Sequence, residues 1–213
     1  MRGVKMKKNL HFLLKVIMIT IMICTITIAN VPAEAATTQV STLSSSKQLF
    51  KSLKKVGKKI SKANFTYGKS SKTNFKDSKK EKRSFCADYV TWALQENGDL
   101  PYSMRIYGSR SGKLSGSGKK AILKNYKLIE CKKKTSKIKF KPGDIICLYK
   151  LSGKFGWHMM VFAKYDKNGN PLWYSGGTDA LGSNGHYSKK KMTTARRLRH
   201  YEKGYTAFIL RRK

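Results

Sequence analysis

The chain has 213 residues, of which 46 are Lys or Arg and 11 are Asp or Glu, so its formal net charge is +35 at pH 7. Hydrophobic residues make up 40% and aromatic residues 11% of the sequence, which is enough for a buried core and excludes a wholly disordered chain. The length suits one domain of roughly 100–150 residues with an additional arm. So large a positive charge predicts contact with a polyanion.

Residues 1–35 have the three parts of an export signal. The first 15 positions hold five basic and no acidic residues. Val16–Ala29 is an apolar run of 14 residues without charge, and Ala33-Glu34-Ala35 has the small-x-small pattern of a cleavage site. An uncleaved membrane anchor is the alternative, but a bilayer requires about 20 apolar residues. We therefore expect cleavage, a secreted or wall-associated protein, and no membrane span in the mature chain.

The cysteine count argues against a simple disulfide framework. Cys24 lies within the apolar run of the signal, which leaves Cys86, Cys131 and Cys147 in the exported part. An odd number of cysteines in an exported protein leaves at least one free thiol. Whether Cys131 and Cys147 pair stays open.

The predicted arm, residues 36–63, consists of a flexible linker over 36–46 and a basic amphipathic helix that begins at Lys47. Apolar residues recur there at helical spacing between Leu49 and Ile60. Two interpretations remain. The helix can pack its apolar stripe on the domain and leave its lysines in solvent, which we favour, or it can lie on an anionic membrane surface.

Residues 64–213 are expected to form one domain. Residues 66–83 are rich in Lys and Ser and predict a loop, and residues 102–118 are rich in Gly and Ser and predict a long mobile loop. The pattern predicts helices over residues 84–95, with Ser84 as the N-cap, and over residues 119–126.

After these helices the periodicity changes to that of β-strands. A Lys-Asn-Gly-Asn turn at residues 167–170 separates two of the apolar runs. A leading helix followed by an antiparallel meander predicts an α+β fold. The strands are expected at residues 145–149, 159–164, 172–174 and 206–210.

Cys86 is a candidate nucleophile because it lies in the first turn of the predicted helix. Free N–H groups and the helix dipole stabilise a thiolate there and are expected to lower the pKa of the thiol. The alternative is a structural cysteine on the buried face of the helix. By itself, the position of Cys86 favours this alternative slightly.

His158 is the best candidate for a base among the four histidines. A Pro-Gly-Asp turn at residues 142–144 opens one strand, and Gly156-Trp157-His158 opens the next, so the imidazole can project toward a helix packed on the sheet. His11 lies in the export signal, and the other two histidines lie in polar, basic stretches. The alternative for His158 is an ordinary surface histidine.

Together these segments resemble a known family. A helix with Cys86, Tyr89, Val90 and Trp92 in the pattern Cys-x-x-Tyr-Val-x-Trp, then Pro-Gly-Asp-Ile, then a histidine that opens an apolar strand, is similar to the NlpC/P60 and CHAP cell-wall hydrolases. The resemblance covers residues 64–213 and implies a papain-like fold. It also implies that Cys86 is the nucleophile and that His158 is its general base.

The family's third polar residue lies on the strand after the histidine, and the resemblance places it at Ser175, with Asp179 as the alternative. The residues that flank Cys86, Phe85 and Ala87-Asp88, differ from the Asp-Cys-Ser-Gly of NlpC/P60 members and are closer to the CHAP pattern. The peptide specificity of the NlpC/P60 enzymes is therefore not carried over.

The sequence thus predicts a secreted cysteine hydrolase that cleaves amide bonds in peptidoglycan without a metal or other cofactor. Its charge predicts binding to anionic wall polymers such as teichoic acids, and no motif for specific nucleic-acid recognition is present. Two alternatives remain: a catalytically inactive basic protein that binds wall polymers or membrane surfaces, and a papain-like acyltransferase.

Overall fold

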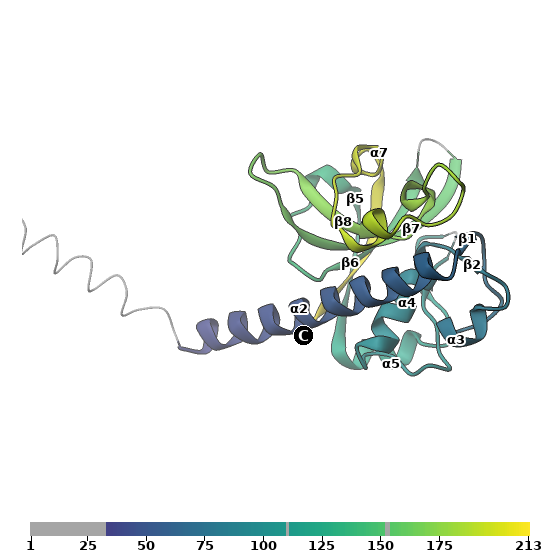
Figure 1. The fold of residues 1–213 in the computed structure, drawn as a ribbon. Coiled ribbons are helices and arrows are strands. Elements are labelled where there is room, and N and C mark those ends of the chain that lie inside the picture. The colour runs from purple at the N-terminus through teal and green to yellow at the C-terminus, as the bar shows by residue number, and fades with distance from the viewer. Residues whose placement is uncertain (1–32, 110, 152–153) are drawn as a thin grey trace, which may run out of the picture. The chain divides into compact units, whose positions relative to one another are not determined.

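The computed structural model describes residues 33–109, 111–151 and 154–213 (Figure 1). The chain divides into two units, residues 1–41 and residues 42–213, and the second contains the fold discussed below. Residues 1–32, which hold most of the predicted export signal, lie outside the described residues. No helix in the described ranges is long and apolar enough to cross a membrane.

A five-stranded antiparallel sheet forms the centre of the second unit, with the strand order β5-β9-β6-β7-β8 (Figure 1). Together with the helices it confirms the predicted α+β class. The strands are β5 (Tyr126–Lys134), β6 (Ile145–Leu151), β7 (Lys154–Tyr165), β8 (Pro171–Ser175) and β9 (Tyr205–Arg212).

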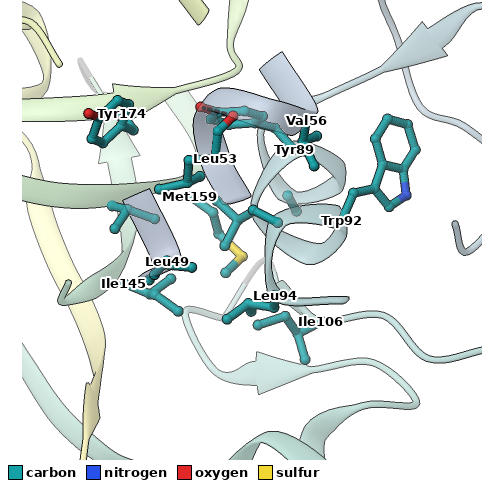
Figure 2. Close-up of a cluster of buried hydrophobic side chains, with 14 of the residues drawn as sticks. Leu49, Leu53, Val56, Tyr89, Trp92, Leu94, Ile106, Ile145, Met159 and Tyr174 are labelled. Carbon is teal, nitrogen blue, oxygen red and sulfur yellow. Dashed lines mark hydrogen bonds between the residues drawn. The ribbon is translucent and has the colours of Figure 1, made fainter. Parts of the chain in front are cut away.

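Each face of the sheet contributes to a different hydrophobic cluster, because successive side chains of a strand point to opposite faces. On β7, Met159 and Val161 pack with helix α4 (Cys86–Glu96), whereas Met160 and Phe162 pack with Trp173 on the other face. Figure 2 shows the first cluster, where Met159 and Ile145 of the sheet meet side chains of the helices.

Helix α2 (Ala33–Lys62) contributes its apolar stripe to the first cluster (Figure 2). Leu53 and Ile60 are 0% exposed, and the backbone carbonyl of Leu53 accepts a hydrogen bond from the Tyr89 hydroxyl of α4 at 3.2 Å. The prediction that this helix packs on the domain is confirmed. The membrane-surface alternative is wrong for this structure, since the apolar side chains that would enter a bilayer are already buried.

Helix α2 also begins earlier than expected, because residues 36–46, predicted as a flexible linker, are helical. Starting a helix is costly, but extending an existing one adds a hydrogen bond for each residue fixed. The packed segment from Leu49 to Ile60 supplies the start, and the small polar residues before it extend the helix.

The two predicted loops contain short elements. Residues 66–83 include the first strand of a small parallel pair and one helical turn, and residues 102–118 include a two-stranded hairpin. The predicted helix near residue 119 is present. These elements are β1 (Thr66–Tyr67), α3 (Phe75–Ser78), β2 (Arg83–Ser84), β3 (Tyr107–Gly108), β4 (Leu114–Ser115) and α5 (Lys119–Asn125).

The remaining elements lie between the strands of the large sheet. Two are single 3₁₀ turns and two are short helices that follow β8. They are η1 (Thr135–Lys137), η2 (Thr178–Ala180), α6 (Lys189–Thr193) and α7 (Arg199–Glu202).

The N-cap of α4 is Phe85 and not Ser84 as predicted. The Asp88 carboxylate accepts a hydrogen bond from the Phe85 backbone N–H at 3.1 Å, which fixes the entry of the chain into the helix. The Ser84 hydroxyl is buried and has no hydrogen-bond partner among the residues that the structure describes. Cys86 is therefore the first residue of the helix.

Because α2 supplies part of the core, Leu53→Ala should destabilise the protein by about 2–5 kcal/mol through the cavity it leaves. The neighbouring exposed Lys54→Ala should change the free energy of unfolding by no more than about 0.5 kcal/mol. Urea titration of both variants measures these values. An unchanged unfolding midpoint for Leu53→Ala would contradict the docking of α2.

Candidate active site

Cys86 places its thiol against strand β7. Its Sγ accepts hydrogen bonds from the backbone N–H groups of Met159 and of Ala87, the next residue of α4. Only 1% of the Cys86 surface is exposed. The thiol therefore lies beside the residue that directly follows His158 in the chain.

The expected lowering of the Cys86 pKa is wrong. Burial raises the pKa of the thiol to about 12, and the nearby carboxylates of Asp88 and Asp179 add to the rise. The two backbone N–H donors oppose this effect and only partly offset it. A charged thiolate loses its hydration in such a site, and this loss outweighs the favourable helix terminus. At neutral pH Cys86 is a thiol and requires a base.

His158 lies on β7 and is 4% exposed. Its ring stacks on the ring of Tyr201 from α7, with 4.2 Å between centroids and 16° between planes. Burial lowers the pKa of His158 to about 4, against an opposing effect of Asp179. The imidazole is therefore neutral near pH 7 and has one nitrogen free of a proton.

The hydrogen bonds around Ser175 determine which nitrogen that is. Ser175 Oγ donates its only proton to Asp179 Oδ1 at 3.1 Å, and a carboxylate paired with a guanidinium can only accept. The 2.9 Å hydrogen bond between His158 Nε2 and Ser175 Oγ must then be donated by Nε2–H. The lone pair of His158 is consequently on Nδ1.

Asp179 is itself held by two further side chains. Tyr201 donates its hydroxyl proton to Asp179 Oδ1 at 3.0 Å, and Arg196 forms an ion pair with Oδ2. Ser175 and Asp179, which the sequence offered as alternatives, thus belong to one chain of hydrogen bonds, His158–Ser175–Asp179. We call this chain the histidine relay.

Sequence reasoning missed Tyr201 and Arg196, because nothing in their local sequence marks them as neighbours of His158. The sequence carried one indication of this close packing, the pair Gly176-Gly177 that follows β8. A side chain at Gly177 would lie 2.6 Å from both His158 Cε1 and Asp179 Oδ1, so the close approach requires glycine.

The Cys86 thiol contacts the backbone of Met159, which directly follows His158, and no hydrogen bond joins the thiol to the imidazole among the described residues. Catalytic hydrogen bonds are often long or misaligned without substrate, so this geometry does not exclude the pair. Cys131 and Cys147 are both free thiols, with Cys131 partly exposed on β5 and Cys147 buried in β6.

No protein-family model, no curated protein and no solved structure matches the chain. Within the described residues, no group of three or more His, Cys, Asp or Glu side chains is arranged to hold a metal ion.

The relay predicts that His158 is the Nε2–H tautomer at pH 7, and that Ser175→Ala removes the acceptor that selects it. Long-range ¹⁵N–¹H NMR spectra distinguish the two tautomers without a substrate. We expect the signals of pure Nε2–H imidazole in the wild type and of a tautomer mixture in Ser175→Ala. The exposed Ser136→Ala is the control. An Nδ1–H tautomer in the wild type would overturn the assignment.

The lowered His158 pKa also predicts a pH dependence of stability. The unfolded chain takes up a proton at His158 below its ordinary pKa of 6.5, whereas the folded chain does so only near 4. The contribution of neutral His158 to the free energy of unfolding is therefore complete above pH 6.5 and is lost as the pH falls from 6.5 toward 4.

Between pH 7 and pH 4.5 the wild type should therefore lose about 2 kcal/mol more stability than His158→Gln. Urea unfolding of both proteins at the two pH values measures the difference. Other groups, such as Asp88, whose pKa burial raises to about 7, titrate in both proteins, and their effects cancel in the comparison. Equal losses of stability in the wild type and in His158→Gln would mean that folding does not lower the pKa of His158.

Proposed function

We propose that residues 64–213 form a papain-like cysteine hydrolase domain that cleaves amide bonds in peptidoglycan outside the cell. The observation that carries the proposal is the histidine relay, which leaves Nδ1 of His158 as a base on the strand against which the Cys86 thiol packs. The resemblance to the NlpC/P60 and CHAP hydrolases supplies the substrate class.

The reaction begins with transfer of the Cys86 proton to His158 Nδ1. The sulfur then attacks the amide carbonyl carbon, and backbone N–H groups at the start of α4 stabilise the oxyanion. His158 gives the proton to the leaving amine as the C–N bond breaks and a thioester forms. Water, deprotonated by His158, hydrolyses the thioester, releases the acid and regenerates the thiol.

The histidine relay supports this cycle at the step where His158 is charged. The imidazolium is formed inside a buried site, where it is costly. Its Nε2–H points to a serine whose own proton is held by Asp179, so the negative charge of Asp179 stabilises the cation through Ser175. A positioned acid–base group of this kind typically contributes 10²–10⁴-fold in rate.

A second candidate function is a catalytically inactive protein that binds wall polymers. The burial of Cys86 at 1% exposure and the rise of its pKa favour this alternative, because a substrate must displace covering side chains before it reaches the sulfur. Tyr67, which is 44% exposed, is near enough to interact electrostatically with Cys86.

A direct assay distinguishes the hydrolase from the inactive binding protein. Purified peptidoglycan is incubated with the protein, and the products are identified by mass spectrometry. Hydrolysis should release fragments that have gained one water at an amide bond. Cys86→Ser should reduce the rate on the order of a thousandfold or more, since a serine hydroxyl in this site is far harder to deprotonate.

Cys131→Ser is the matched control, because this partly exposed thiol lies on β5. It should retain activity close to that of the wild type. Equal losses in the two variants would assign the cysteines a structural role. A wild type that binds walls but releases no fragment would favour the inactive binding protein.

A further inference from the structure

The exposed face of α2 carries a row of lysines that the core packing of the helix does not use. All five members are exposed, and they recur at intervals of three or four residues. At 100° per residue they fall within an arc of about 80° on the side opposite to Leu53 and Ile60. We call this set, Lys47, Lys51, Lys54, Lys58 and Lys62, the lysine row.

The lysine row has no internal charge partner. Within the described residues none of its members forms an ion pair, and the sequence has no acidic residue from position 35 to position 76. Glu96 pairs with Lys55 and Lys59, which flank the row, and leaves the row itself uncompensated. Like charges at i,i+4 destabilise a helix. An external anion that neutralises the lysine row would remove this destabilisation.

The geometry of the row favours a linear polymer over a membrane. A rise of 1.5 Å per residue separates neighbouring lysines by about 5–6 Å and gives the row a length of about 22 Å. A helix that binds a bilayer inserts its apolar face, but that face of α2 is buried against the domain. The row therefore offers only point charges along a straight line.

We propose that the lysine row is the docking track for a linear phosphodiester polymer, whose successive phosphates lie along α2. This inference deepens the proposed function, because it names the partner that holds the enzyme at the wall and the surface that binds it. It rests on the proposed function only for the location outside the cell, since binding does not require Cys86.

The test compares two triple variants with equal loss of charge. The first removes three members of the row as Lys51→Gln, Lys54→Gln and Lys58→Gln. The second removes three cations from another basic surface, a hollow of about 490 Å³ lined by residues of η1, α7 and the segments beside them. This control carries Lys134→Gln, Arg199→Gln and Lys203→Gln.

Binding of the full-length protein and both variants to poly(glycerol phosphate) is measured as a function of salt. Each lysine that neutralises a phosphate of a single chain contributes about 0.7 to the slope of log K against log salt. The row variant should therefore lose about 2 from the slope and on the order of a hundredfold in affinity at low salt. The hollow variant should stay within about threefold of the wild type.

Several outcomes would overturn the proposal. Equal losses in both variants would mean that binding follows net charge alone, and a loss only in the hollow variant would place the polymer there. Tight binding to phosphatidylglycerol vesicles without binding to the polymer would assign the row to a membrane. Thermal unfolding followed by circular dichroism checks that both variants are folded.

Hydrolysis of a soluble peptidoglycan stem peptide separates this inference from the proposed function. Both triple variants should retain the wild-type rate on this substrate, because neither changes the histidine relay or Cys86. If the wild type itself shows no hydrolysis, the proposed function fails while the binding comparison still decides the role of the lysine row.

Discussion

The single proton of the Ser175 hydroxyl is the constraint on which the candidate site depends. Asp179 accepts that proton, so Ser175 can only accept from His158, and the tautomer of the imidazole follows. A serine beside a histidine would otherwise be a weak partner, because a bond between neutral groups contributes only about 0.5–1.5 kcal/mol. The Asp179 carboxylate makes the Ser175–Asp179 bond charge-assisted and polarises the serine oxygen that accepts from His158.

Burial has opposite effects on the two groups that the proposed reaction needs. It raises the pKa of Cys86 to about 12 and lowers the pKa of His158 to about 4, so the neutral pair is strongly favoured over the ion pair. In the proposed reaction, polar groups of the substrate would surround the thiol and let the sulfur pass its proton to Nδ1 during the attack. The buried, protonated thiol of Cys86 is also a poor target for oxidation, which favours exposed thiolates.

Much of the site could be predicted from local sequence. Apolar spacing placed Cys86 at the start of a helix and His158 on a strand, and the turn at residues 167–170 fixed the hairpin in which Met160 pairs with Ser175. Each of these depends on residues near each other in the chain, where helical and strand periodicity is visible. The hairpin register then brings Ser175 within hydrogen-bonding distance of His158.

The features of the site and the fold that were not predicted depend on contacts between residues far apart in the sequence. Tyr201 reaches His158 from α7, more than 40 residues later in the chain, and no local pattern reports that approach. Strand β5 was missed because its sequence, YKLIECKKK, ends in lysines that face solvent at the edge of the sheet. The pKa of Cys86 was misjudged because the helix terminus is visible in sequence, whereas the depth of burial is not.

The distribution of charge connects the fold to its proposed partner. Residues 36–213 contain 10 acidic residues, and six of them form ion pairs within the described chain. Five of these six pair with arginines, and Asp88, Asp99 and Asp144 are buried in such pairs. The guanidinium suits these positions because it is weakly hydrated, and at Asp144 it binds the carboxylate with two donors, Nε–H and Nη2–H of Arg211.

This use of arginine leaves the lysines largely unopposed. Among described residues only Lys55 and Lys59 pair with an acidic side chain, and both pair with Glu96. Six of the ten negative charges are thus held in ion pairs within the described chain, while most lysines have no acidic partner there. Lysines that recur along one face of a helix, as in the lysine row, concentrate positive potential there. The two basic side chains thus have different places: most of the ion pairs use arginine, and the unpaired lysines of the lysine row form the proposed binding surface for a polyanion.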